Sequence, residues 1–158
     1  MGRDIHVRIV KRNRETDTWK QIRLYRKEKK KFKAIDIYPF RDCVLFDILN
    51  EKEDDKYNAY PISLIHLPEN LQKEITECKN SLGYYGFKET TLADLKLYFQ
   101  KVPKVRDWDY EDDDPNAWKD NPIKSFIERI EQYIDFFDPF WDFHTSPTDY
   151  KILYWFDC

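Results

Sequence analysis

Glycine and cysteine are scarce in this sequence, and long apolar runs are absent. With only three glycines among 158 residues, it has no phosphate-binding loop of the G-x-x-x-x-G-K-S/T or G-x-G-x-x-G type. The three cysteines are widely spaced, so we expect reduced thiols rather than a disulfide framework or a CxxC metal site. No stretch approaches the roughly 20 apolar residues that span a bilayer, and the first residues lack the pattern of a secretory signal. We therefore expect a cytoplasmic protein without membrane contact.

Charge and aromatic rings are abundant instead. Charged residues make up 36% of the chain and aromatic residues 17%, which is too much ring surface for a disordered protein. The net charge of -3 hides an asymmetry, because residues 1–41 carry a net +9 and residues 42–158 a net -12. Such polarity fits a basic arm for nucleic acid or a membrane surface, and it equally fits two halves that pack together.

The periodicity of the apolar residues predicts an α+β fold. Alternating runs at residues 4–10, 19–25 and 32–38 predict a meander of three antiparallel strands, and the apolar run 150–156 predicts a central strand covered on both faces. Helical spacing marks residues 41–50, 71–83, 92–101 and 122–138, whereas the acidic stretch 106–120 is typical of a loop. We expect one domain, residues 1–158, in which an antiparallel sheet made of the meander and the C-terminal strand packs against three to four helices.

Five stretches resemble a family of small bacteriophage and prophage proteins. Residues 1–6, MGRDIH, are similar to the family's MGxDIH start, and residues 154–157, YWFD, to its terminal WFD. Between them, residues 41–46 match R-N/D-x-x-L-F, residues 61–70 match PIS…GLPED, and residues 91–95 match TLxEL. The resemblance implies an α+β domain, a phage or prophage origin and the cytoplasm of a host cell, but no biochemical function.

This chain departs from the family pattern just before the TLxEL stretch. Many members have a histidine-rich HSxSW there, whereas residues 83–89, GYYGFKE, contain no histidine. A metal or catalytic role of that histidine pair therefore does not carry over.

The polar face of the first strand holds the main candidate site. If Ile5, Val7 and Ile9 face the core, the alternate residues of that strand line the opposite face. Asp157 joins them if the last strand pairs beside the first. A carboxylate and an imidazole at this spacing suit an acid–base pair or two corners of a divalent metal site, but Asp4 can equally serve only to fix a tautomer of His6. The candidate ligand-binding residues are Asp4, His6, Arg8, Arg41, Trp155 and Asp157.

Two further segments are candidates for binding. The basic stretch 23–33, with Tyr25 and Phe32, suits a polyphosphate or nucleic-acid backbone, although lysines also guard edge strands and turns. A long nucleic acid would be repelled by the acidic remainder of the chain. The aromatic loop 138–143 cannot hide every ring, so an exposed remnant would serve as a partner patch, a self-association patch or a stacking platform.

Three hypotheses about function follow. The favoured one is a phage accessory protein that binds a small anionic ligand, such as a nucleotide, or a host protein, and does not catalyse a reaction. The second is a metal-dependent phosphoesterase or nuclease that holds a divalent ion with Asp4, His6 and Asp157. The third is a self-assembling structural protein that forms homo-oligomers.

Overall fold

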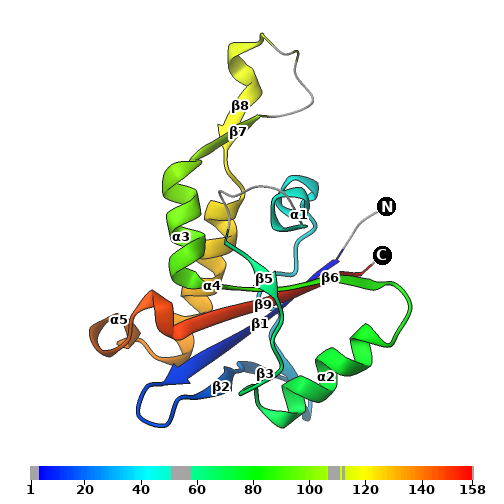
Figure 1. Ribbon diagram of the computed structural model, residues 1–158, viewed down its shortest axis with the longest axis vertical. Helices are drawn as coiled ribbons and strands as arrows, with labels where there is room; N and C mark the ends of the chain where they lie inside the picture. The colour runs from blue at the N-terminus through cyan, green and yellow to red at the C-terminus, as the bar shows by residue number, and fades with distance from the viewer. Residues whose placement is uncertain (1–3, 51–57, 107–110, 112, 158) are drawn as a thin grey trace.

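The centre of the molecule is a five-stranded antiparallel sheet with the order β2-β1-β9-β6-β5 (Figure 1). A computed structural model describes residues 4–50, 58–106, 111 and 113–157. The strands of this sheet are β1 (Asp4–Asn13), β2 (Thr18–Ile22), β5 (Tyr60–Pro61), β6 (Tyr84–Thr91) and β9 (Tyr150–Asp157). The C-terminal strand β9 lies between β1 and β6, so its nearly continuous apolar sequence is buried on both faces.

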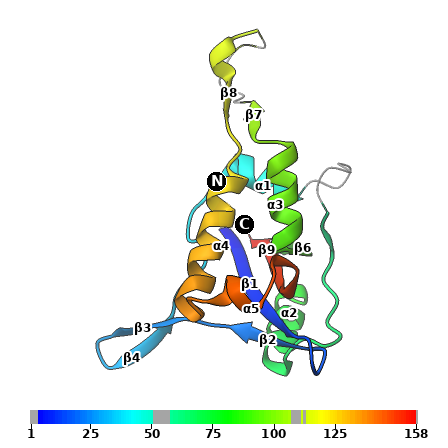
Figure 2. The ribbon, with the colours of Figure 1, turned by 90° about the vertical axis from the view of Figure 1, so that its left-hand side faces the viewer.

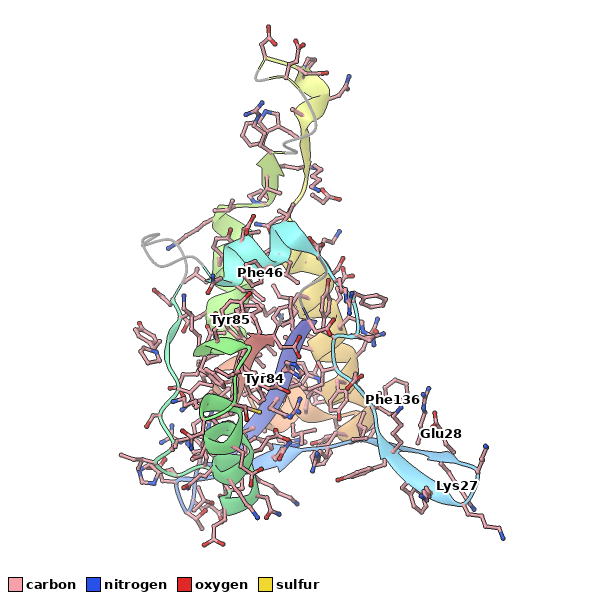
Figure 3. All side chains as sticks on the ribbon, turned by 90° about the vertical axis from the view of Figure 1, so that its right-hand side faces the viewer. Lys27, Glu28, Phe46, Tyr84, Tyr85 and Phe136 are labelled. Carbon is pink, nitrogen blue, oxygen red and sulfur yellow. The ribbon has the colours of Figure 1, made fainter. Side chains whose placement is uncertain are left out.

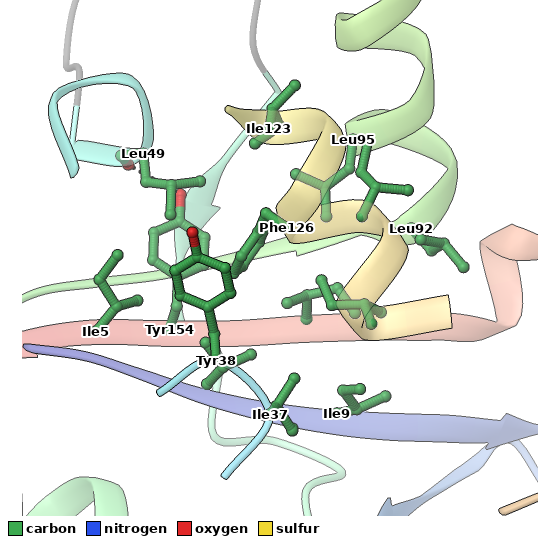
Figure 4. Packing of buried hydrophobic residues seen from close by; sticks show 14 of the residues in the cluster. Ile5, Ile9, Ile37, Tyr38, Leu49, Leu92, Leu95, Ile123, Phe126 and Tyr154 are labelled. Carbon is green, nitrogen blue, oxygen red and sulfur yellow. Dashed lines mark hydrogen bonds between the residues drawn. The ribbon is translucent and has the colours of Figure 1, made fainter. Parts of the chain in front are cut away.

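Helices cover the two faces of the sheet unequally. The larger core lies between one face and α1 (Cys43–Asn50), α3 (Leu92–Lys101) and α4 (Ile123–Phe137) (Figure 4). The other face packs against α2 (Glu69–Lys79), where Leu71 and Ile75 contact a smaller cluster that includes Leu153 and Trp155. Alternate residues of β1 and β9 therefore serve different cores.

Local capping signals mark the starts of α3 and α4, close to where the sequence predicts them. Thr91 caps α3, because its hydroxyl accepts a hydrogen bond from the Asp94 amide at 3.1 Å. The side chain of Asn121 accepts a hydrogen bond from the Ile123 amide at 3.0 Å at the start of α4. A short helix, α5 (Trp141–His144), and two single 3₁₀ turns, Pro115–Ala117 and Pro147–Asp149, complete the helical elements of the described residues.

The predicted α+β class is confirmed, but the third strand of the predicted meander is wrong. Residues 32–38 do not join the five-stranded sheet, because β3 (Tyr25–Glu28) and β4 (Lys31–Ala34) form a separate two-stranded hairpin. The chain leaves the sheet at Leu24, whose amide donates to the Tyr133 hydroxyl on α4 at 2.7 Å and whose carbonyl accepts from the Ile35 amide at 2.8 Å. On the side of β9 away from β1, the neighbouring strand is β6, which the sequence pattern did not predict.

Two arms extend from the body of the molecule (Figure 2). One is the β3–β4 hairpin. The other is formed by β7 (Lys104–Arg106) and β8 (Trp118–Asp120), which pair within the stretch predicted to be a loop, so that prediction is wrong at both ends of the stretch. The pairing of Val105 with Lys119 supplies backbone hydrogen bonds that the charge density of the sequence did not suggest. Residues 107–110 and 112, which include Asp107, Asp109 and Asp112, lie outside the described residues.

None of the described helices has the length and apolar character needed to cross a membrane.

Candidate functional site

The antiparallel pairing of β1 with β9 brings the predicted site residues together. Asp4 lies opposite Asp157, and His6 lies opposite Trp155. Because residues directly opposite each other point to the same face of a sheet, all four side chains lie on the face that packs against α2. Arg41 reaches them from the segment before α1, and Arg8 follows on the same face of β1. We call these six residues the strand-pair cluster.

His6 is held by Asp157 rather than by Asp4. Its Nε2 lies 2.7 Å from Asp157 Oδ2, and its ring stacks on Trp155 with centroids 5.8 Å apart and planes 14° apart. Asp4 instead accepts a hydrogen bond from Arg41 Nε at 2.6 Å. The alternative in which Asp4 serves only to fix a tautomer of His6 is therefore wrong, because the carboxylate that contacts the imidazole is Asp157 and Asp4 binds Arg41.

Both arginines of the cluster are bound to carboxylates. Arg8 Nε donates to Glu74 Oε1 on α2 at 2.7 Å, and the Arg8 guanidinium lies 5.2 Å from the centre of the Trp155 ring. The hydrogen bond and charge of Asp4, aided by the charge of Asp157, raise the pKa of Arg41. An anionic ligand would therefore have to displace a carboxylate from either arginine.

The cluster does not assemble a set of three metal ligands. Among the residues that the structure describes, no three His, Cys, Asp or Glu side chains are arranged to hold a metal ion. At this site the reason is geometric, since His6 and Asp157 face each other while Asp4 faces Arg41. A divalent ion bound here would have to draw further ligands from water or a substrate.

Trp155 contributes an unsatisfied donor to the same face. The side chain is almost fully buried, and its ring lies between His6 and the stacked ring of Phe87, whose centroid is 5.6 Å away. Among the described residues, the Trp155 Nε1–H finds no hydrogen-bond acceptor. Beside the cluster, a pocket of about 260 Å³ is lined by residues 4–8 of β1 and residues 36–40. Its acidic lining residues are Asp4 and Asp36.

The β3–β4 hairpin differs from the strand-pair cluster in its basic side chains. Both arginines of the cluster bind carboxylates, whereas, among the described residues, most of the basic side chains of the hairpin do not. Residues 23–33 contain seven basic residues and one acidic residue. Among the described residues, Arg26 pairs with Glu28, whereas none of the five lysines of this stretch makes an ion pair. The backbone turns at Lys29, where φ is 57°, so the lysines surround the tip of the arm. The basic stretch singled out from the sequence therefore forms a cationic arm whose lysines are unpaired among the described residues.

A groove at the base of this hairpin was not predicted from the sequence. It measures about 280 Å³ and lies between the two ends of the arm, residues 24–25 and 35–37, and the last turns of α4, where Tyr133 and Phe136 line it. Phe136 is 81% exposed at this groove. In Figure 3 Phe136 lies beside the base of the arm that carries Lys27 and Glu28. We call the hairpin and this groove together the hairpin surface.

The aromatic loop 138–143 is partly exposed, as predicted. Trp141 is buried and donates from its indole nitrogen to Asp135 at 2.5 Å, whereas Phe140 and Phe143 are exposed. The remaining histidines are isolated from the strand-pair cluster, with His144 bound to Asp138 at 2.7 Å and His66 in a turn with positive φ.

Comparisons with known proteins found no match, neither to a family model, nor to a curated protein, nor to a solved structure.

Proposed function

We propose that this chain is a phage or prophage accessory protein that acts by binding a protein of the host cell, not by catalysis. The observation that carries the proposal is the cationic arm, whose five lysines have no acidic partner among the described residues and whose base borders exposed rings. Protein interfaces are enriched in aromatic side chains and surround them with a polar rim, and an exposed apolar patch with polar edges marks an interaction site. The resemblance to the phage family suggests where such a partner would be found.

The pairing of charges favours a protein over a small anionic ligand. A nucleotide at the strand-pair cluster would meet three carboxylates: Asp4 and Glu74, which already bind the two arginines of the cluster, and Asp157, which binds His6. On the arm, the lysines lie along a two-stranded hairpin, and the space that residues 28–33 line is open to solvent rather than an enclosed cavity that would bury a small molecule. A protein surface meets an arm of this kind without needing a cavity.

A capture experiment with matched variants tests the proposal. The full chain is immobilised and exposed to a lysate of the bacterial host, and bound proteins are quantified by mass spectrometry. One variant carries Lys27→Glu, Lys31→Glu and Lys33→Glu. Its control carries Lys20→Glu, Lys73→Glu and Lys124→Glu, which changes the net charge equally at exposed positions away from the arm.

We expect a host protein that the wild type and the control capture equally and that the hairpin variant loses. Equal capture by all three proteins would refute the role of the arm. Hydrolysis of bis(p-nitrophenyl) phosphate with Mn²⁺ that disappears in His6→Ala would replace the proposal by the metal-dependent enzyme. Light scattering that shows concentration-dependent oligomers, abolished by Phe143→Ser, would replace it by self-assembly.

A further inference from the structure

We infer that the hairpin surface binds an acidic polypeptide segment that places one large apolar side chain in the groove at the base of the arm. This inference rests on the proposed function and names the chemistry of its partner. It depends on three features of the described residues: the two faces of the hairpin, the composition of the groove, and the distribution of charge over the molecule.

The register of the hairpin gives its two faces different chemistry. Tyr25 lies opposite Ala34 and Lys27 lies opposite Phe32, so these four side chains share one face. The other face holds two further cross-strand pairs, Arg26 with Lys33 and Glu28 with Lys31. Phe32 is 72% exposed and Tyr25 is also exposed. One face of the arm is therefore partly aromatic, and the other is almost entirely charged.

The aromatic face leads into the groove. Tyr25 belongs to both, since it also lines the groove together with Ile35, Tyr133 and Phe136. The charged side chains of the groove are Arg129 and Asp36. Arg129 is already engaged, because its guanidinium lies 5.3 Å from the centre of the Phe40 ring. A volume of about 280 Å³ with this lining accommodates one or two apolar side chains.

The distribution of charge selects an acidic polypeptide. Lys27 on the aromatic face, with Lys29 and Lys30 at the tip of the arm, complements Asp and Glu side chains next to an apolar anchor. A nucleic acid or an anionic membrane is a more extended polyanion, and it would also meet the net -12 of residues 42–158. Asp36 in the groove would repel a phosphate but not an apolar side chain.

Two short synthetic peptides test this inference with the full, ¹⁵N-labelled chain. Both consist of Asp and Glu residues, with Leu-Phe at the centre of one and Ser-Ser at the centre of the other. We expect the first peptide to shift the amide resonances of residues 24–37 and 132–136, and to bind about tenfold or more tightly than the second, since burial of one large apolar side chain contributes at least that factor. In Phe136→Ser the two peptides should bind alike, while both retain the salt-dependent contact with the lysines.

Equal binding of the two peptides to the wild type would overturn the inference, and so would shifts that map outside the hairpin surface. Tighter binding of a single-stranded oligothymidylate, or of vesicles containing phosphatidylserine, would overturn it in favour of a phosphate-bearing partner. If the hairpin variant loses its host partner but the peptides do not differ, the proposed function survives and this inference fails. If the host lysate yields no partner while the peptides differ as expected, the proposed function fails and the groove chemistry stands.

Discussion

Two glycines with positive φ offer a matched test of how β6 packs against the central strand. Gly83 has φ +91° and Gly86 has φ +70°, so alanine is strained at both positions. A Cβ at Gly83 would meet no atom within 4 Å, whereas a Cβ at Gly86 would lie 2.6 Å from Phe156 Cδ2 and 3.0 Å from Asn50 Oδ1. Phe156 is fully buried and its ring centroid lies 4.6 Å from that of Phe46, so the ring has no room to retreat.

We therefore expect Gly83→Ala to cost about 1 kcal/mol from the backbone conformation alone. Gly86→Ala should lose roughly 2 kcal/mol more, because overpacking a close-packed core costs about 1–3 kcal/mol. Urea unfolding followed by tryptophan fluorescence measures both changes, with the m-value serving as a check on the unfolded state. Combining Gly86→Ala with Phe156→Leu should recover part of the difference. Equal losses in the two alanine variants would refute the packing of β6 against β9 described above.

Three further predictions concern single hydrogen-bonded positions. Burial raises the pKa of Asp149, but hydrogen bonds from the Arg14 guanidinium and a backbone amide outweigh it and leave this pKa below its ordinary value. The resulting stabilisation is complete above about pH 4 and is lost as the pH falls through the lower, folded-state pKa, so acid titration of Asp149→Asn should show a flatter loss of stability. Tyr154→Phe removes the buried hydroxyl that donates to the Leu49 carbonyl at 3.0 Å and should cost about 1–2 kcal/mol in urea unfolding. Thr91→Ala removes the cap of α3 and should cost about 1 kcal/mol, whereas Thr91→Ser should retain most of it.

Elements with a local signal were predictable from the sequence. Strict alternation at residues 4–10 gives β1, and the continuous apolar run at the C-terminus gives β9 its central place. The Thr91 cap and the Asn121 and Pro122 pair fix the starts of α3 and α4 within a residue or two. These signals depend on contacts within one turn or one strand, which is why the sequence alone shows them.

Elements defined by distant partners were not predictable. In β6 every residue from Tyr84 to Glu89 is half-buried, and the register shifts between Tyr85 and Lys88, so no alternation marks the strand. Conversely, residues 32–38 alternate but lack a partner strand in the five-stranded sheet, because the chain has already turned towards α4 at Leu24. Alternation shows only that a strand is compatible with a segment, whereas pairing depends on the rest of the fold.

In the strand-pair cluster, too, one contact was predictable from the sequence, whereas contacts with distant partners were not. The pairing of the first and last strands, which the sequence suggested, places Asp157 beside His6. The partners that decide the chemistry of the arginines are Glu74 on α2 for Arg8 and Asp4 for Arg41, and no spacing in the sequence reveals either contact. Asp149, which holds Arg14 across the fold, is hidden in the sequence for the same reason.

The contrast between the two halves of the chain explains why the hairpin surface is the better candidate. Basic side chains on and near β1 form ion pairs with acidic residues of the second half of the chain. Arg8 pairs with Glu74, and Arg14 pairs with Asp149. The lysines of the arm form no such ion pairs among the described residues. They also do not protect an edge of the five-stranded sheet, because among the described strands β3 and β4 pair with each other alone. A two-stranded hairpin is at best marginally stable by itself, and Phe32 is exposed rather than buried in a core that would stabilise the arm. An arm that gains so little from folding, yet presents aromatic and cationic side chains together, is best explained by a partner that covers it.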